Sequence, residues 1–508
     1  MGDVNVAEVL AFALYMIAVL VVGIVFFEKG KKDEGGDKDY FLGGRNMNGL
    51  VAALSAGASD MSAWVLMGLP GSIYLYGMGQ VWISVGLFIG TVVAWVCVAP
   101  KLRRYSIVAK DSITIPQFLT NRFMSNNKSL QVVSAVIFLI AYCVYAASSI
   151  VACGDLFNTV FGLNKNVAMI GATVVILVYT FLGGFNAVCW TDFIQGMLML
   201  VALMAVPIIA CGAMGTEGFV PVKPVVTPDN YYNPLSSGSF DWKSISDILS
   251  GLGWGLGYMG MPHILVRYMS IRSDREMKKS QITGCLWTGL ILVMASVVAL
   301  VAHEYLGSAL DADSKSMVFI TMVRKLLVEN KGVILIFIAG ILIAAILAAS
   351  MSTADSQLLA SASAFASDFY KPVVRKNAKD KEMLWAGRIM VALISVIALL
   401  IAMNPDMADI MGLVENAWGA FGASFGPAVI LALYWKRLTY WGAFAGIIAG
   451  FATDALWLAF LSKSTGLYEI IPGFIAGLIV SVVVSKLTPA PSNDVLYLFD
   501  KAKNKINY

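Results

Sequence analysis

Apolar runs long enough to cross a bilayer recur along the whole chain, and short polar stretches separate them. About 20 apolar residues cross the hydrocarbon core as a helix, and these runs are too long and too uniformly apolar for barrel strands. The pattern predicts an all-α polytopic membrane protein with about 13 transmembrane helices. The expected spans are 6–27, 49–74, 78–98, 129–159, 167–185, 187–215, 244–269, 282–305, 332–365, 384–403, 409–434, 438–461 and 468–486.

Composition agrees with this pattern. Of the 508 residues 58% are apolar and only 13% are charged, and no segment is large and polar enough for a soluble catalytic or nucleotide-binding domain. We expect one transmembrane domain over residues 1–490 and a short cytoplasmic tail at 487–508. The acidic N-terminus lacks a cleavage signal, which favours a retained first span. The six cysteines lie in or beside apolar runs and are interpreted as small buried hydrophobic residues.

Lysine and arginine are distributed unevenly between the two sets of connections. With the N-terminus outside, the cytoplasmic connections hold 27 of these residues and the opposite connections hold 8. Short loops rich in Lys and Arg stay in the cytoplasm. We therefore expect a multi-pass protein of the cell membrane (inner or plasma membrane) with its N-terminus outside and its C-terminus cytoplasmic.

The spans divide into two groups of five, which suggests an inverted repeat. Spans 2–6 cover residues 49–215 and spans 7–11 cover 244–434, with peripheral spans at 6–27 and 438–486. Each group opens with an interrupted span, at Ser55–Trp64 in the first and at Gly251–Pro262 in the second. Glycine- or proline-interrupted spans at corresponding positions of two halves indicate a transporter with its site at the membrane midplane.

The first interruption contains an ionisable residue at membrane depth. Asp60 lies among small and hydroxyl residues, and Gly57 weakens the helix one turn earlier. A charge at this depth is costly and usually marks an ion or substrate pathway, although a neighbouring helix could simply satisfy it. Backbone carbonyls freed by the break could coordinate a cation.

Span 9 contains a polar patch whose oxygen atoms could also coordinate a cation. Ser352, Asp355 and Ser356 share one helical face, and Ala349 lies one turn before Ser352 and Thr353. Hydroxyls that bond back to the preceding turn are the simpler interpretation. Hydroxyl, carbonyl and carboxylate oxygens without a sulfur or imidazole cluster suit a hard cation rather than a transition metal.

In span 7, Trp254, Tyr258 and Pro262 recur every four residues beside the glycines, and Tyr145 of span 4 could add a further wall. Aromatic stripes are commonly packing surfaces, but the exposed backbone here favours a pocket for a small, partly apolar zwitterion.

Other classes of function fit less well. A passive channel needs a continuous polar pore lining, and a transport-like sensor needs a large cytoplasmic signalling domain. An intramembrane enzyme needs a nucleophile–base pair or a metal site, and the sequence shows neither, so we expect no enzymatic activity.

At these residues the chain resembles the sodium/solute symporter family and, within it, the bacterial sodium/proline symporters. The similarity covers roughly residues 6–490. Its motifs are Tyr40–Arg45, Leu54–Ser62, Met67–Gly71, Trp190–Gln195, Gly253–Tyr258, Pro262–Ile264, Met351–Thr353, Phe421–Pro427 and Gly466–Phe474.

The resemblance implies sodium-coupled import of L-proline by alternating access, with sodium as a co-transported ion and no cofactor. It implies no nucleic acid and no obligate protein partner. A symporter of another small solute, driven by sodium or protons, remains the alternative. The implied sodium ligands are carbonyls of Ala58, Met61 and Ala349 and hydroxyls of Ser352 and Thr353.

Further roles follow from the same resemblance. Asp60 and Ser62 would act in ion coupling, and Arg45 would serve the inner gate. The proline pocket would be shaped by Trp254, Tyr258, Pro262 and Tyr145.

The chain departs from the family pattern at Ala63, Met261, Asp355 and Glu415. Asp192 matches the family, and with Asp355 and Ser356 it could form a second cation site, although two carboxylates could instead share a proton. The number of sodium ions per cycle therefore stays open at this point.

Overall fold

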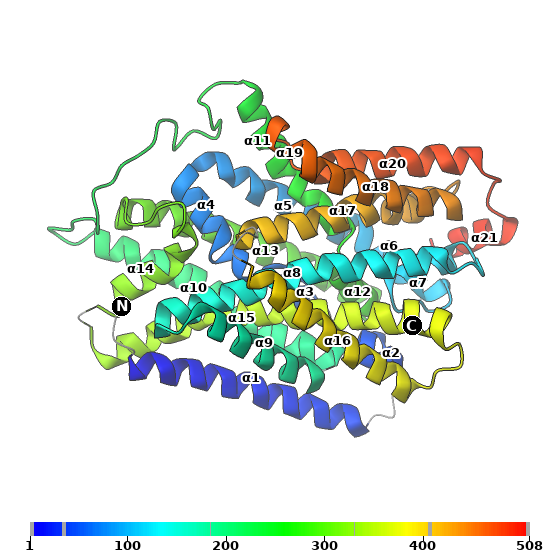
Figure 1. Cartoon of the computed structure of the whole chain (residues 1–508), viewed down its shortest axis with the longest axis horizontal. Helices are drawn as coiled ribbons and strands as arrows, with labels where there is room; N and C mark the ends of the chain where they lie inside the picture. The colour runs from blue at the N-terminus through cyan, green and yellow to red at the C-terminus, as the bar shows by residue number, and fades with distance from the viewer. Residues whose placement is uncertain (1–4, 33–36, 183, 330, 405–408, 504–508) are drawn as a thin grey trace.

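The structure is a computed structural model that describes residues 5–32, 37–182, 184–329, 331–404 and 409–503. Within these ranges the chain is helical, with a single isolated β-bridge between Met47 and Ile271. Long helices lie side by side along the longest axis of the molecule (Figure 1). Nine helices of the described chain are long and apolar enough to cross a membrane, and one bent pair makes ten. The predicted all-α polytopic membrane protein is confirmed.

The long helices lie close to the expected spans. They are Met78–Val108 (η3, Met78–Gln80; α5, Val81–Val93; η4, Ala94–Val98; α6, Ala99–Val108), α8 (Ser129–Phe161), α10 (Phe185–Met214), α13 (Asp274–Leu306), α15 (Val333–Ala364) continued by η7 (Phe365–Val374), α16 (Asp380–Ala402), α17 (Ile410–Tyr434), α18 (Tyr440–Phe460) and α20 (Ile470–Leu487). The other expected spans coincide with α1 (Val6–Lys32), α9 (Lys165–Leu182) and two interrupted segments.

The first interrupted segment is α3 (Gly49–Asp60), η2 (Ala63–Val65) and α4 (Gly68–Tyr76). Its two halves are bent by 73° at the break. The bend begins where Met61 leaves helical geometry, and Ser62 then caps η2 by accepting the Trp64 amide. The break predicted around Asp60 is therefore present, and it lies deep in the protein because every residue from Val51 to Tyr74 is buried.

The second interrupted segment is α11 (Trp242–Gly253), the 3₁₀ helix η5 (Trp254–Met259) and α12 (Pro262–Ser270). Its glycines allow close contact as well as interruption. A Cβ on Gly255 would lie 2.3 Å from the carbonyl oxygen of Gly86, and a Cβ on Gly90 would lie 2.3 Å from that of Gly255. The two backbones touch because neither carries a side chain there, so η5 is held directly against α5.

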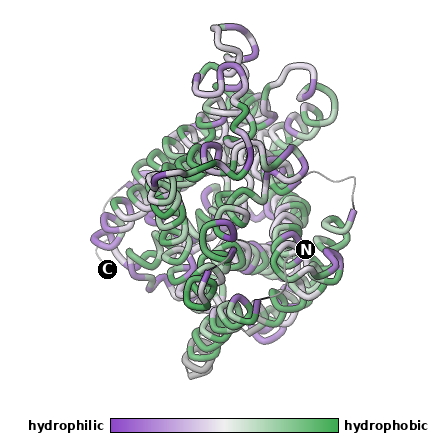
Figure 2. Tube along the Cα trace, turned by 90° about the vertical axis from the view of Figure 1, so that its left-hand side faces the viewer, coloured by the Kyte–Doolittle hydropathy of each residue, from purple (hydrophilic) through white to green (hydrophobic). Residues whose placement is uncertain are grey.

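The remaining helices surround these two segments. α3 packs against α10, α13, α12 and α15, while α17 packs against η5, α8, α18 and α20. Hydrophobic residues dominate the outer helices as well as the inner ones (Figure 2). Ile208, Leu286 and Leu400 are 62%, 64% and 65% exposed, which suits a surface that faces lipid rather than water.

Short helices also form where hydropathy gave no signal. They are α2 (Asp37–Leu42), η1 (Gly43–Arg45), α7 (Ile115–Arg122), η6 (Lys315–Met317), α14 (Val318–Leu327), α19 (Ser462–Thr465) and α21 (Asn493–Lys501). α13 begins eight residues before its expected span, at 274 rather than 282, because Ser273 caps its polar first turn by accepting the Glu276 amide.

Three of the arginines counted in the expected cytoplasmic connections are buried, namely Arg103, Arg122 and Arg267, and Arg267 also falls inside the expected span 244–269. Arg267 was counted among the residues of a cytoplasmic connection, but it lies inside α12 and is only 2% exposed. Its guanidinium finds partners within the protein, which hydropathy alone does not reveal. Without Arg267 the expected cytoplasmic connections hold 26 Lys and Arg residues against 8, so the charge asymmetry persists.

Candidate functional site

The break in α3 frees one backbone carbonyl for contact with α15. The Met61 amide bonds to the Gly57 carbonyl at 2.8 Å, but the next amide, that of Ser62, bonds to Asp60 at 2.9 Å instead of reaching Ala58. The Ala58 carbonyl therefore leaves the helical pattern. It accepts the Ser352 hydroxyl at 2.9 Å and the Thr353 hydroxyl at 3.5 Å.

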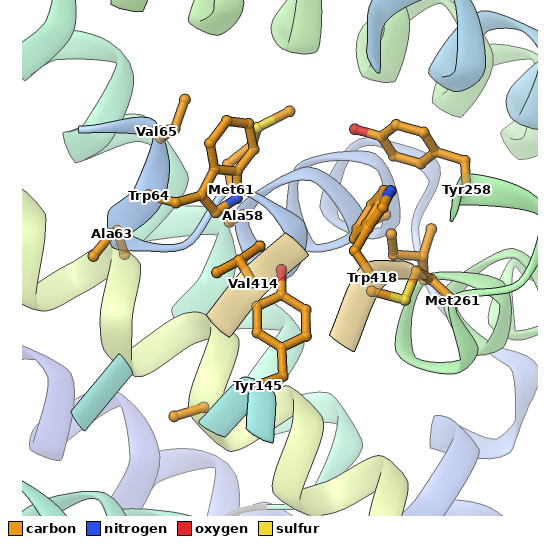
Figure 3. Close-up of a cluster of buried hydrophobic side chains, with 14 of the residues drawn as sticks. Ala58, Met61, Ala63, Trp64, Val65, Tyr145, Tyr258, Met261, Val414 and Trp418 are labelled. Atoms are coloured by element: carbon orange, nitrogen blue, oxygen red, sulfur yellow. The ribbon is translucent and has the colours of Figure 1, made fainter. Parts of the chain in front are cut away.

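The facing helix adds a second carbonyl to this group. Ser352 also donates to the Ala349 carbonyl at 3.1 Å, so the oxygens of Ala58, Ala349, Ser352 and Thr353 converge between α3 and α15. All four residues are fully buried. Met61, which follows Ala58 at the bend, lies beside it (Figure 3). Oxygen atoms of this kind, without sulfur or imidazole, form the ligand set of a hard cation.

Asp60 joins this region to the second interrupted segment. Its carboxylate accepts the hydroxyl of Tyr258, which lies in η5. Its backbone carbonyl accepts the Tyr145 hydroxyl at 3.3 Å and the Trp64 indole at 3.2 Å. Hydrogen bonds to an ionised carboxylate are about twice as strong as neutral ones. The structure thus brings Asp60, Tyr258 and Tyr145 together from three separate helices.

Aromatic rings cover this meeting point. The Trp254 ring lies 6.0 Å from that of Trp64 and 6.3 Å from that of Trp418, and Tyr258 meets Trp418 edge-to-face at 5.2 Å. The Trp418 indole donates to the Trp254 carbonyl at 2.7 Å. Figure 3 shows Tyr258 and Trp418 side by side, with Tyr145 below the Ala58–Met61 turn.

Sequence reasoning missed Trp418. A Cβ on Gly257 would lie 2.0 Å from its indole nitrogen, so the indole packs directly on the glycine backbone. The available signal was the glycine run itself, because closely spaced glycines can accommodate a large ring from a neighbouring helix as well as interrupt their own.

A polar cavity of about 250 Å³ opens beside these rings. Trp254 lines it, together with Gln80, Asp247, Lys315 and Glu415. Its lining residues come from α4, η3, α5, α11, η5, η6 and the start of α17. Trp254 therefore borders both this cavity and the aromatic group around Trp418 and Tyr258.

Pro262 is separated from the other predicted pocket residues. It begins α12 and lines a small second cavity of about 20 Å³, which also touches His263, Arg267 and Ser356. The two cavities have no lining residue in common. Tyr145 and Tyr258 line neither cavity, so the four predicted pocket residues do not border one common cavity in this conformation; the chain becomes extended at Met261, between η5 and α12.

The third predicted cluster is built around Arg267. Its guanidinium donates to Asp192 at 2.8 Å, to Ser356 at 2.5 Å, to Ser55 at 2.6 Å and to the His263 carbonyl at 2.7 Å. The sequence analysis brought Asp192 and Ser356 together but did not identify this partner. The signal was a single arginine inside an otherwise apolar helix, Pro262–Ser270.

Arg45 makes a separate group of contacts. It donates to the Asp111 carboxylate at 2.7 Å, the Ser106 hydroxyl at 3.0 Å and the carbonyls of Met269 and Ser112 at 2.7 and 2.6 Å. One side chain thus joins η1 to α6, to the loop after α6 and to the end of α12. Arg45 itself lies close to α2 in the chain, and none of the residues involved lines the polar cavity.

Comparison with known proteins decides the family. The model of the sodium:solute symporter family matches residues 40–450. The chain belongs to the sodium:solute symporter family. It is therefore a Na⁺-coupled solute symporter of the membrane and not an enzyme.

Relatives within this symporter family are similar over nearly the full chain. The osmoregulated proline transporter OpuE of Bacillus subtilis is 40% identical over 97% of this chain and 98% of its own. The high-affinity proline transporter PutP of the same organism is 43% identical over 91% and 95%. A sodium/proline symporter of Staphylococcus aureus is 39% identical over 96% and 94%.

Solved structures show the same fold at low identity. An outward-open, substrate-bound Na⁺-coupled sialic acid symporter superposes with a TM-score of 0.77 at 19% identity, covering 96% of this symporter and 99% of that chain. A nucleobase-cation-symport-1 family transporter in a closed conformation gives a TM-score of 0.55 at 13% identity, covering 91% and 98%.

Proposed function

We propose that this symporter imports L-proline together with Na⁺ across the cell membrane. The observation that carries the ion assignment is the Ala58 carbonyl, which leaves its own helix and faces the hydroxyls of Ser352 and Thr353. The substrate assignment is supported by three proline-transporting relatives at 39–43% identity over more than nine tenths of this chain.

The proposed Na⁺ ligands are the carbonyls of Ala58, Met61 and Ala349 and the hydroxyls of Ser352 and Thr353. The hydroxyl–carbonyl hydrogen bonds between α3 and α15 give way when the ion enters, because a hydroxyl oxygen can present a lone pair to a cation while its proton turns away. Ion binding would therefore fix the position of α3 against α15. Asp60 and Ser62, at the same bend, transmit this change.

The proposed proline pocket lies between Trp254, Tyr258 and Tyr145, and Pro262 borders it on the side of the small cavity. Aromatic walls suit the apolar pyrrolidine ring, and the broken backbone of η5 supplies polar groups for the charged ends of the zwitterion. Tyr258 bonds to Asp60, so a ligand that contacts this tyrosine also acts on the segment that binds the ion. Coupling requires such a difference in affinity between the two conformations.

The direction of transport follows from the proposed orientation. With the N-terminus outside and the C-terminus cytoplasmic, the polar cavity faces outward and Arg45 holds the inner gate. Na⁺ binds first from outside, proline follows, and the Arg45 contacts then release as the core opens inward.

One Na⁺ per cycle is sufficient for uphill import. A single charge that moves through −100 mV contributes about 2.3 kcal/mol and a tenfold Na⁺ gradient about 1.4 kcal/mol, which together sustain roughly 500-fold accumulation.

Uptake of labelled L-proline into proteoliposomes tests the proposal, with an imposed Na⁺ gradient, an imposed proton gradient, or neither. We expect concentrative uptake with Na⁺ alone. Uptake with protons alone would refute the coupling ion and keep the substrate. No uptake under any gradient would refute the substrate, and other small solutes would then be tested.

A further inference from the structure

The Arg267 side chain occupies the centre of a buried acidic cluster. It is 2% exposed, and Asp192 is fully buried. Its four contacts come from four elements: Ser55 of α3, Asp192 of α10, His263 of its own helix α12, and Ser356 of α15. Two of these elements, α3 and α15, also carry the proposed Na⁺ ligands.

The contacts of Arg267 are those that a bound cation would make. Oδ2 of Asp192 accepts Arg267 at 2.8 Å and the Ser55 hydroxyl at 2.6 Å, and the Ser356 hydroxyl lies 3.4 Å away. Carboxylate, hydroxyl and carbonyl oxygens around one point form a hard-cation ligand set, and here a guanidinium lies at that point. Arginine stays protonated in proteins, so this positive charge is permanent.

A second carboxylate, that of Asp355, completes the acidic cluster around the Arg267 guanidinium. Asp355 is close enough to Arg267 to interact with it electrostatically, and its Oδ1 lies 3.3 Å from the Ser356 hydroxyl. Its Oδ2 and the Oδ1 of Asp192 have no hydrogen-bond partner. Several oxygens are needed to replace the water around a hard cation, and the oxygens of Ser55 and Ser356 already face the guanidinium.

We propose that Arg267 is a built-in cation that occupies the second ion position of this transporter, so the protein carries one Na⁺ per cycle. This inference rests on the proposed Na⁺ coupling and deepens it. It also gives α12 a direct link to the ion-binding helices, because the guanidinium of α12 is bound by side chains of α3 and α15.

A purely structural ion pair is the competing explanation. Removal of one partner from a buried ion pair destabilises a protein in either case, so loss of stability alone does not distinguish the two. The number of bound Na⁺ ions does. Arg267→Gln removes the charge but leaves both carboxylates and both serine hydroxyls in place.

The experiment counts ²²Na⁺ bound to the purified full-length protein, without proline. We expect one ion per wild-type molecule and two per Arg267→Gln molecule, with the Hill coefficient for Na⁺ rising from about 1 to about 2. The double variant Arg267→Gln/Asp192→Asn is the matched control. It lacks both charges of the pair and should bind one ion.

Two ions per wild-type molecule, or one per Arg267→Gln molecule, would overturn the inference. If Arg267→Gln does not fold, the test is the net charge transported per proline molecule by the wild-type protein in proteoliposomes. One charge per proline supports the inference, and two charges refute it. The binding count needs no substrate, so a failure of proline uptake leaves it intact. A wild-type protein that binds no Na⁺ would instead refute the ion coupling proposed above.

Discussion

At the scale of single residues, removal of two similarly buried serine hydroxyls is expected to change the Na⁺ dependence of uptake to different extents. Ser352 faces the Ala58 carbonyl across the helix interface, whereas Ser350, two residues earlier, bonds back to the Ile346 carbonyl at 2.9 Å within its own helix. Ser352→Ala or Thr353→Ala should raise the Na⁺ concentration for half-maximal uptake by about tenfold or more, because a hydrogen bond or ligand contact to a charge contributes ~1.5–3 kcal/mol. Ser350→Ala should leave it nearly unchanged. An equal change in the Na⁺ concentration for half-maximal uptake in Ser350→Ala and Ser352→Ala would contradict the assignment of Ser352 as a Na⁺ ligand.

Substitution of Asp60 is expected to reduce Na⁺-driven uptake more than substitution of its hydrogen-bond partner Tyr258. Asp60→Ala removes the carboxylate at the bend and should abolish Na⁺-driven uptake, whereas Tyr258→Phe removes only the hydrogen bond to that carboxylate and should mainly raise the KM for proline. Initial rates at varied Na⁺ and proline separate the two effects. Intact uptake with unchanged Na⁺ dependence in Asp60→Ala would show that this residue has no part in coupling.

Local pattern was sufficient to place Asp60 at a break and Ser352 and Thr353 in a polar patch of another span, whereas the pairing of these two spans was implied only by the family resemblance. It could not find Arg267 or Trp418, because their importance depends on neighbours about 75 and 160 residues away in the sequence. A charge at the edge of an apolar run looks the same whether it faces water or a buried carboxylate. Only the packing of α12 against α3 distinguishes these environments.

At the scale of elements, the fit of η5 against α17 depends on one missing side chain. Gly257→Ala places a methyl group 2.0 Å from the Trp418 indole nitrogen, so the ring or the helix must shift. Overpacking of this kind typically costs about 1–3 kcal/mol. We expect a lower melting temperature in detergent and slower uptake.

Gly171→Ala in α9 is the matched control, because nothing lies within 4 Å of its Cβ position. Alanine favours a helix over glycine, so this variant should be neutral or slightly more stable. If Gly257→Ala melts at the same temperature as the wild-type protein, the direct packing of the Trp418 indole on Gly257 would be refuted.

The inner gate is a second test at this scale. Arg45→Gln removes the ion pair with Asp111 and weakens the contacts that join η1 to α6 and α12. A cysteine placed at Ala360, which lines the small cavity, should then react several-fold faster with a maleimide added from the cytoplasmic side. Arg272→Gln removes a half-exposed ion pair with Glu276 nearby and should not change the rate.

At the scale of the whole molecule, hydropathy predicted the fold class and most span positions because lipid makes long apolar helices obligatory. It failed for α7, α14 and α21, which are too short or too polar to cross a membrane. It also placed the start of α13 too late, since that helix continues beyond its apolar part into polar residues capped by Ser273. The division into repeats at 49–215 and 244–434 stays a prediction.

The orientation of the bundle is open to a direct test. Single cysteines at Ser239 and Lys376, both exposed, lie on connections expected outside and inside, in a variant without the native cysteines. A membrane-impermeant maleimide added to intact cells should label the cysteine at position 239 and spare the one at 376. The reverse pattern would invert the topology and make the polar cavity face the cytoplasm.

The rings of Trp64, Trp254 and Trp418 make the molecule optically informative. The Trp254 ring lies about 6 Å from each of the other two, Trp254 lines the polar cavity, and Trp64 follows Asp60 by four residues. Indoles at this separation interact through their excited states. A movement of the proposed ion-binding bend that changes these separations should therefore alter the emission and near-ultraviolet dichroism of the unlabelled protein.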